Sequence, residues 1–159
     1  HIDAPYHFYA NGPTIDQIPL TDCTGPAVLL DLFDLPVIDA QHLSPHREQL
    51  TTHRHAILHT GWYRQWGEDH FFTEHPVLTA AAAQLLVDCG VLLLGVDFPS
   101  VDRSPHQAHL VLLGNNLLIV ENLTNLDAIG PRPFDFSAIP LAIVGRDGSP
   151  VRAFARIND

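Results

Sequence analysis

The 159-residue sequence contains no lysine and no methionine, and its eight basic residues are all arginines. Eighteen acidic residues outnumber them, so the net charge is −10 at pH 7 with histidine counted as neutral. Without a basic patch to neutralise phosphates, the chain is not expected to bind nucleic acid. The absence of methionine, even at position 1, predicts that the sequence is the C-terminal part of a longer chain, or the ordered remainder of one.

Long apolar runs and cysteines are also scarce. No stretch approaches the ~20 apolar residues of a membrane-spanning helix, and no signal peptide is visible. The two cysteines, Cys23 and Cys89, lie far apart in the sequence and do not form a metal-binding pair. Such thiols are typical of a reduced protein, with one disulfide as the alternative. We therefore expect a cytoplasmic protein with no membrane partner.

The motifs of several enzyme classes are missing as well. The sequence has no Gly-x-Ser-x-Gly elbow, no reactive-cysteine motif and no phosphate-binding loop. What is present is the apolar content of an ordinary globular protein, in a length that fits one domain over residues 1–159.

Apolar runs bounded by turn residues predict strands, and capped runs of helix-forming residues predict helices. Strands are expected at residues 27–33, 55–60, 91–97, 117–121, 138–144 and 151–156. Helices are expected at residues 39–49, 80–88 and 106–113. The Asp-Gly pair at 147–148 predicts a hairpin between the last two strands. Strands interspersed with two or three helices indicate a single α/β or α+β domain.

The first seven residues carry a dense group of metal-binding side chains. In an extended segment His1 and Asp3 point to one side and Ile2 to the other. Pro5 fixes a bend that can carry His7 back toward them. Two imidazoles and a carboxylate at one place suit a divalent cation such as zinc or manganese. The alternative is an ordinary polar strand with two surface histidines.

Residues 1–7, His-Ile-Asp-Ala-Pro-Tyr-His, resemble the second half of the signature His-x-Gly-Thr-His-x-Asp-x-Pro-x-His. That signature belongs to the cyclase family of metal-dependent hydrolases, which includes bacterial kynurenine formamidase and isatin hydrolase. Residues 109–123 resemble the second metal-binding stretch of the family, and residues 59–62 and 95–102 resemble further family stretches. The first histidine of the signature would precede residue 1, so the N-terminal part of the family's domain is expected to be missing.

The resemblance implies the swivelling β/β/α fold of the family, an α/β fold with mixed sheets and two or three helices. It also implies a site for one or two zinc or manganese ions. In that site His1, Asp3, His109 and Glu121 would be the metal ligands, and Asp3 would bridge two ions. His7 would be the catalytic residue that carries a proton from water to the leaving amine.

The residues alone leave parts of this assignment open. A carboxylate at the end of a buried strand, such as Glu121, could pair with an arginine or a helix N-terminus instead of a metal. His106 precedes His109 by three positions and shares its helix face. The spacing of His109 from Glu121 matches the family and favours His109. His53 and His55 form a His-x-His pattern that is expected to be a half-exposed strand face.

Three further residues are expected to bind substrate. His59 and Trp62 lie in a stretch that resembles a family segment near the active site, and Phe98 lies in a loop that is expected to line the pocket. Trp62 could instead be a core residue, as large aromatic side chains usually are.

The activity implied by the resemblance is hydrolysis of a small aryl amide by metal-activated water. Conversion of N-formylkynurenine to kynurenine and formate is the leading case, and opening of a cyclic amide such as isatin is the alternative. The resemblance also implies a homo-oligomer, a dimer or a tetramer.

Two further hypotheses come from other functional classes. One is a non-catalytic family member that acts as a binding or assembly module. The other is a copper site formed by the α-amine and imidazole of His1 in a processed chain.

Overall fold

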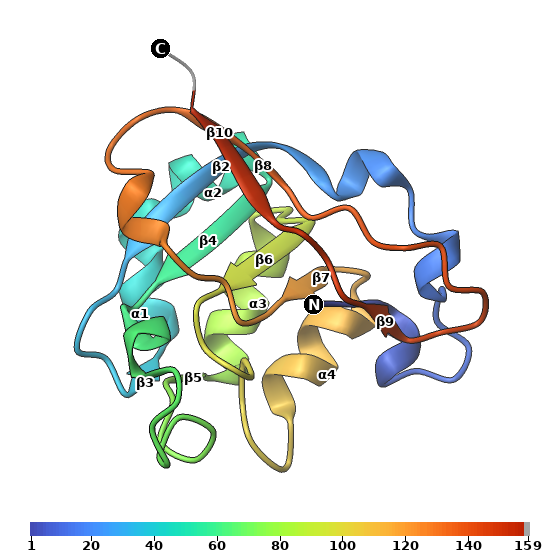
Figure 1. The fold of residues 1–159 in the computed structure, drawn as a ribbon, viewed down its shortest axis with the longest axis horizontal. Helices are drawn as coiled ribbons and strands as arrows, with labels where there is room; N and C mark the ends of the chain where they lie inside the picture. Colours follow the sequence, from blue (N-terminus) through green and yellow to red (C-terminus); the bar gives the residue numbers. More distant parts are fainter. Residues whose placement is uncertain (158–159) are drawn as a thin grey trace.

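The structure is a computed structural model that describes residues 1–157, and within them the main feature is a mixed sheet of eight strands (Figure 1). The strand order is β10-β8-β2-β4-β6-β7-β1-β9. The four central strands are parallel and the flanking strands are antiparallel. The strands are β1 (Ile2–Asp3), β2 (Thr24–Asp31), β4 (His55–His59), β6 (Leu93–Val96), β7 (Leu118–Val120), β8 (Phe134–Ser137), β9 (Gly148–Ser149) and β10 (Phe154–Ile157). A separate pair is formed by β3 (Val37–Ile38) and β5 (Val77–Leu78).

Alternation along the central strands divides the core in two. In β4, Ala56 and Leu58 pack with the helices, and Ile57 packs into the cluster on the opposite face. A parallel strand that is buried on both faces appears in the sequence as a continuous apolar run. The central strands could therefore be predicted well from the sequence. The helices are α1 (Ala40–Leu43), α2 (Arg47–His53), α3 (Ala80–Asp88) and α4 (Gln107–Gly114). In Figure 1, β10 and the chain that leads back to β9 pass in front of the central strands.

Most of the predicted elements are confirmed, and with them the mixed α/β fold. The expected strands at 27–33, 55–60, 91–97 and 117–121 correspond to β2, β4, β6 and β7, and the expected helices at 80–88 and 106–113 correspond to α3 and α4. The helical segment expected at 39–49 is present, but it is divided in two and extends to His53. Pro45 has no N–H to continue the helical hydrogen bonds, so α1 ends and a 3₁₀ turn at Ser44–His46 leads into α2.

The hairpin expected near the C-terminus is wrong. Residues 138–144 form no regular strand and contribute only an isolated bridge between Pro140 and Val151. Gly148 and Ser149 pair instead with β1, in the register Asp3↔Gly148. The strand that pairs with β10 is β8, which was not predicted. Long-range partners therefore replace the local pairing that the Asp-Gly signal predicts.

Within residues 1–157, the structure contains no helix with the length and apolar character needed to cross a membrane.

Candidate metal centre

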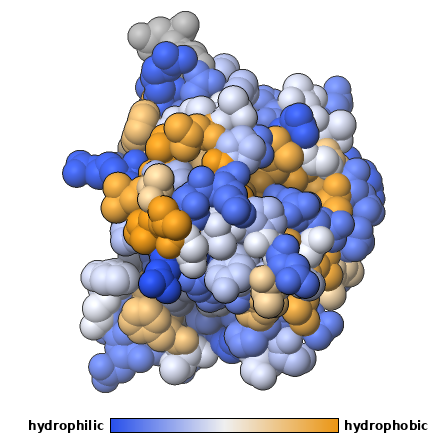
Figure 2. Space-filling view, turned by 90° about the vertical axis from the view of Figure 1, so that its right-hand side faces the viewer, coloured by the Kyte–Doolittle hydropathy of each residue, from blue (hydrophilic) through white to orange (hydrophobic). Residues whose placement is uncertain are grey.

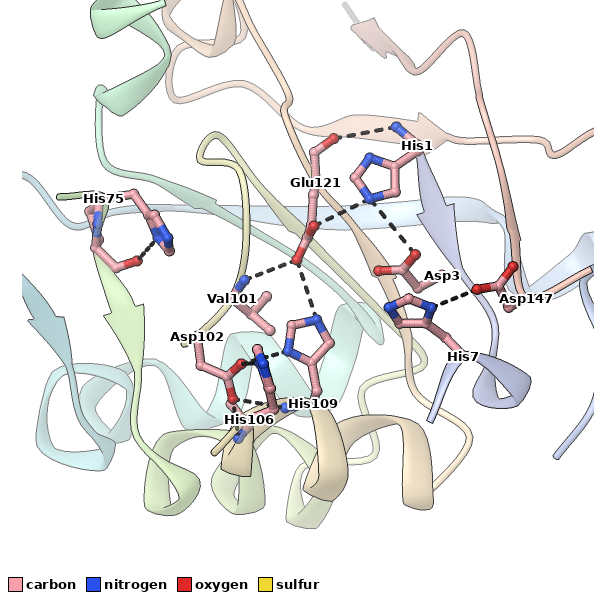
Figure 3. Close-up of polar contacts among 12 residues, drawn as sticks. His1, Asp3, His7, His75, Val101, Asp102, His106, His109, Glu121 and Asp147 are labelled. Carbon is pink, nitrogen blue, oxygen red and sulfur yellow. Dashed lines mark hydrogen bonds and ion pairs between the residues drawn. The ribbon is translucent and has the colours of Figure 1, made fainter. Parts of the chain in front are cut away.

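Three of the predicted ligands converge where β1 lies beside β7 (Figure 3). The register Ile2↔Val120 sets His1 opposite Glu121, whose backbone N–H donates to the His1 carbonyl at 3.1 Å. The Nε2 atom of His1 lies 3.2 Å from Glu121 Oε2 and 3.7 Å from Asp3 Oδ1. One ligand atom from each of these residues lies within 4.8 Å of the others, an arrangement able to hold a metal ion.

The two carboxylates of this group are buried without a permanent positive partner. Asp3 and Glu121 are each 5% exposed, and among the described residues the ion pairs to them come from histidines alone. Burial, followed by the neighbouring charge of Glu121, raises the pKa of Asp3. Burial acts in the same direction on Glu121, but hydrogen bonds from His1, His109 and the Val101 N–H hold its pKa below the ordinary value. Two adjacent buried carboxylates call for a cation.

His109 joins this group from the first turns of α4. Its Nε2 lies 3.6 Å from Glu121 Oε1, and its Nδ1 donates to Asp102 Oδ1 at 2.6 Å. Burial lowers the pKa of His109, but the hydrogen bonds to Asp102 and Glu121 outweigh it and raise the pKa to about 9. The ring of Phe8 stacks on the imidazole at a centroid distance of 4.9 Å. These contacts fix the ring with Nε2 toward the buried acids.

Asp102 has a role that the sequence did not reveal. Its second oxygen, Oδ2, accepts the backbone N–H groups of Ala108 at 2.6 Å and His109 at 3.2 Å, which satisfies free donors at the start of α4. Its Oδ1 also contacts His106 Nδ1 at 3.1 Å. Asp102, His106 and His109 form a second group with ligand atoms close enough for an ion. However, Asp102 already accepts a hydrogen bond from the Nδ1 of His109, so we interpret it as the carboxylate that orients this imidazole.

A pocket of about 480 Å³ opens beside these residues. It is lined by His1, Asp3, His7, Phe8, Ser100, His106, His109, Glu121 and residues 147–150. The 3₁₀ turn Pro5–His7 carries His7 into this pocket, as the bend at Pro5 predicts. One ring nitrogen of His7 contacts Asp147 Oδ2 at 2.7 Å, and Figure 3 shows the ring between Asp147 and Asp3.

The donor atoms fit a divalent cation. Imidazole nitrogens and carboxylate oxygens are the ligands that zinc and manganese take in proteins. His1, Asp3 and Glu121 supply them at short range, with His109 next to Glu121.

The three residues expected to bind substrate do not line this pocket. His59 lies at the end of β4, two strands away from β7 in the sheet, and borders a different cavity together with Asp31 and Asp127. The Trp62 indole donates to the Phe71 carbonyl at 3.1 Å. Phe98 is fully buried. Asp97 explains part of this placement, because its carboxylate accepts the N–H groups of Thr60 and Gly61 and so directs the Trp62 loop. Substrate contact by these three residues stays a prediction.

Comparison with known proteins identifies the family. Residues 1–103 match the family model Cyclase, described as "Putative cyclase". Kynurenine formamidase from Bordetella avium (strain 197N) is 35% identical over 167 residues, which cover 98% of this chain and 74% of that protein. A solved structure described as a potential metal-dependent hydrolase with cyclase activity is 27% identical, with a TM-score of 0.80, and the match covers 96% of this chain and 74% of that one.

The fold alone extends to a more distant structure. Isatin hydrolase A from Labrenzia aggregata, bound to benzyl benzoate, has a TM-score of 0.84 at 22% identity, covering 99% of this chain and 72% of that one. The solved structures agree with the fold described above, and the family model and the curated relative identify the family. The chain therefore belongs to the cyclase family of hydrolases.

Proposed function

We propose that this chain is a metal-dependent hydrolase that cleaves the C–N bond of aryl formamides, with N-formylkynurenine as the leading substrate. The observation that carries the proposal is the convergence of His1, Asp3 and Glu121 beside a histidine, His7, that lies in the same pocket but outside this group of ligands. The similarity to kynurenine formamidase supports the choice of substrate.

His1, Asp3, Glu121 and His109 would hold one or two ions, zinc or manganese. Such an ion, when bound, lowers the pKa of water and polarises the carbonyl group of an amide. Asp3 would help to hold the ion together with His1, whose Nε2 lies 3.7 Å from Asp3 Oδ1.

His7 would act as general base and then as general acid. An amide nitrogen leaves readily only when it is protonated, so a histidine that is free of metal must deliver a proton to it. His7 meets this requirement because it lines the pocket and its ring has one nitrogen turned away from Asp147. A group in this role typically contributes ~10²–10⁴ in rate.

A cyclic amide such as isatin is the alternative substrate, and the fold shared with isatin hydrolase A supports testing it. The alternative function outside enzymes is that of a non-catalytic binding module.

We also propose that the chain forms a homo-oligomer. Leu141 and Val144 are 62% and 81% exposed, and the face seen in Figure 2 carries separate groups of apolar residues. Mass measured by light scattering would determine the oligomeric state.

The test is a hydrolysis assay with N-formylkynurenine and isatin, with zinc and manganese supplied separately. We expect turnover of the formamide, loss of metal binding in Asp3→Ala, and retained metal binding without turnover in His7→Ala. His46→Ala, which removes a histidine from the 3₁₀ turn before α2, is the matched control and should behave like the wild type. A wild-type protein that binds metal but hydrolyses neither substrate would refute the proposal and favour the binding module.

A further inference from the structure

Asp147 is the residue that contacts the side chain of His7. The two side chains meet at 2.7 Å, between His7 Nδ1 and Asp147 Oδ2, and lie 140 positions apart in the sequence. Both are partly exposed, at 38% and 53% of their side-chain surface. Exposed pairs of this kind contribute little to folding stability. The contact therefore needs an explanation other than stability.

The backbone around Asp147 is fixed to the segment that carries the site. The Asp147 carbonyl accepts the N–H of Ala4 at 2.8 Å, so it is tied to the turn that leads to His7. The next residue, Gly148, pairs with Asp3, and a Cβ at Gly148 would lie 2.6 Å from the Ile2 carbonyl oxygen. This close approach of β9 to β1 sets the backbone of Asp147 at one place relative to both Asp3 and His7, within reach of the His7 ring.

We propose that Asp147 is a positioning residue that fixes the orientation and tautomer of His7. A neutral imidazole carries its proton on either nitrogen, and a carboxylate selects the nitrogen that it contacts. With Asp147 at Nδ1, that nitrogen holds the proton and Nε2 is left as the acceptor that faces the pocket. Asp147 is not one of the proposed metal ligands, and in this role it would act on the reaction through His7.

This inference rests on the proposed amide hydrolysis, in which His7 needs a free Nε2. Nε2 takes a proton from the attacking water as the new C–O bond forms. The imidazolium is then stabilised by the Asp147 charge until it gives that proton to the amide nitrogen and the C–N bond breaks. Water and amide are consumed, and one carboxylic acid and one amine are released.

The kinetic test uses Asp147→Asn, Asp147→Ala and Asp147→Glu. For Asn and Ala we expect kcat to fall about 10- to 100-fold, which is less than or equal to the lower end of the ~10²–10⁴ that a general acid/base contributes, because His7 itself is retained. KM and the metal content per chain should stay near the wild-type values, and Glu should restore part of kcat. Any residual rate measurable in His7→Ala should not fall further when Asp147→Asn is added, because the two residues act as a unit. Asp88→Asn, an exposed aspartate on α3, is the matched control.

The second readout does not depend on activity. Long-range ¹H–¹⁵N spectra, recorded with and without zinc at a pH where His7 is neutral, report which ring nitrogen carries the proton. We expect the Nδ1-protonated form in the wild type and a mixture or the opposite tautomer in Asp147→Ala. Wild-type kcat in Asp147→Ala, or an unchanged tautomer, would overturn the inference. If the wild-type protein hydrolyses no amide, the proposed function fails, and the spectra still decide whether Asp147 positions His7.

Discussion

Asp102 accepts a hydrogen bond from the His109 imidazole at the start of α4. The distance between Asp102 Oδ1 and His109 Nδ1 is 2.6 Å. The other oxygen accepts backbone N–H groups of the same helix, including that of His109. A single side chain therefore fixes both the helix end and the ring that it presents to Glu121. Residues that orient a metal-binding histidine in this way tune the metal affinity of the site.

Asp102→Asn should weaken metal binding about 10- to 100-fold, the usual cost of losing such an orienting partner. Asparagine cannot stabilise a protonated His109 ring, whose pKa Asp102 helps to raise, so the metal-free protein should also lose about 1–3 kcal/mol in the free energy of unfolding near neutral pH. Competition with a chelating dye measures the affinity, and urea unfolding measures the stability. Asp88→Asn serves as the control. An unchanged affinity would show that Asp102 does not orient His109 for metal.

Asp3→Asn should have opposite effects with and without metal. In the metal-free protein it removes one of two adjacent buried charges, so we expect the free energy of unfolding to rise by on the order of 1 kcal/mol. With metal at ~100 times the dissociation constant, the wild type gains about 2.7 kcal/mol from binding, and the variant should lose most of this gain. Thermal unfolding in chelator and in excess zinc gives both values. The same sign in both conditions would contradict a cation site at Asp3.

Gly148→Ala should disturb the site through the backbone. The added Cβ would lie 2.6 Å from the Ile2 carbonyl oxygen and 3.3 Å from Asp3 Oδ1. Because a backbone atom cannot move aside cheaply, we expect a loss of about 1–3 kcal/mol in the free energy of unfolding, together with weaker metal binding. Urea unfolding and the dye assay measure the two effects. Wild-type values in both would mean that β9 can shift away from β1 without cost.

Cys23 should be an unreactive thiol in the folded protein. Burial, with a smaller contribution from the charge of Asp22, raises its pKa to about 11. Since the thiolate is the reactive form, alkylation should be slow at neutral pH and should rise about tenfold per pH unit up to that pKa. The rate with iodoacetamide, measured in a Cys89→Ala background so that one thiol remains, tests this. A rate that levels off near ~8.5, the pKa of a free thiol, would contradict it.

The sequence predicted best what depends on local rules. Strand alternation and the bend at Pro5 were enough to predict that His1, Asp3 and His7 lie on one side. The apolar runs in the sequence were enough to locate the parallel strands. His109 and Glu121 came from resemblance to a family, because no local rule relates a helix residue to a strand end twelve positions later.

The residues missed were those whose partners lie far away in the chain. Asp147 looked like part of a hairpin turn, and its contact with His7 exists because β9 pairs with β1 instead. Asp102 looked like part of a loop, and its role follows from where α4 begins. The placement of His59, one of the residues expected to contact substrate, depends on the order of strands in the sheet. The periodicity of a sequence does not give that order.

The insertion of β1 between β7 and β9 has a consequence for biosynthesis. Ile2 pairs with Val120 on one side and Ser149 on the other, so its strand leaves the ribosome long before either partner has been made. The group of His1, Asp3, His109 and Glu121 can form only after residue 121 has emerged, and β1 gains its second neighbour only after residue 149. Long-range pairings of this kind form slowly, so β1 is made before both of its partner strands and is among the last strands to reach its final neighbours.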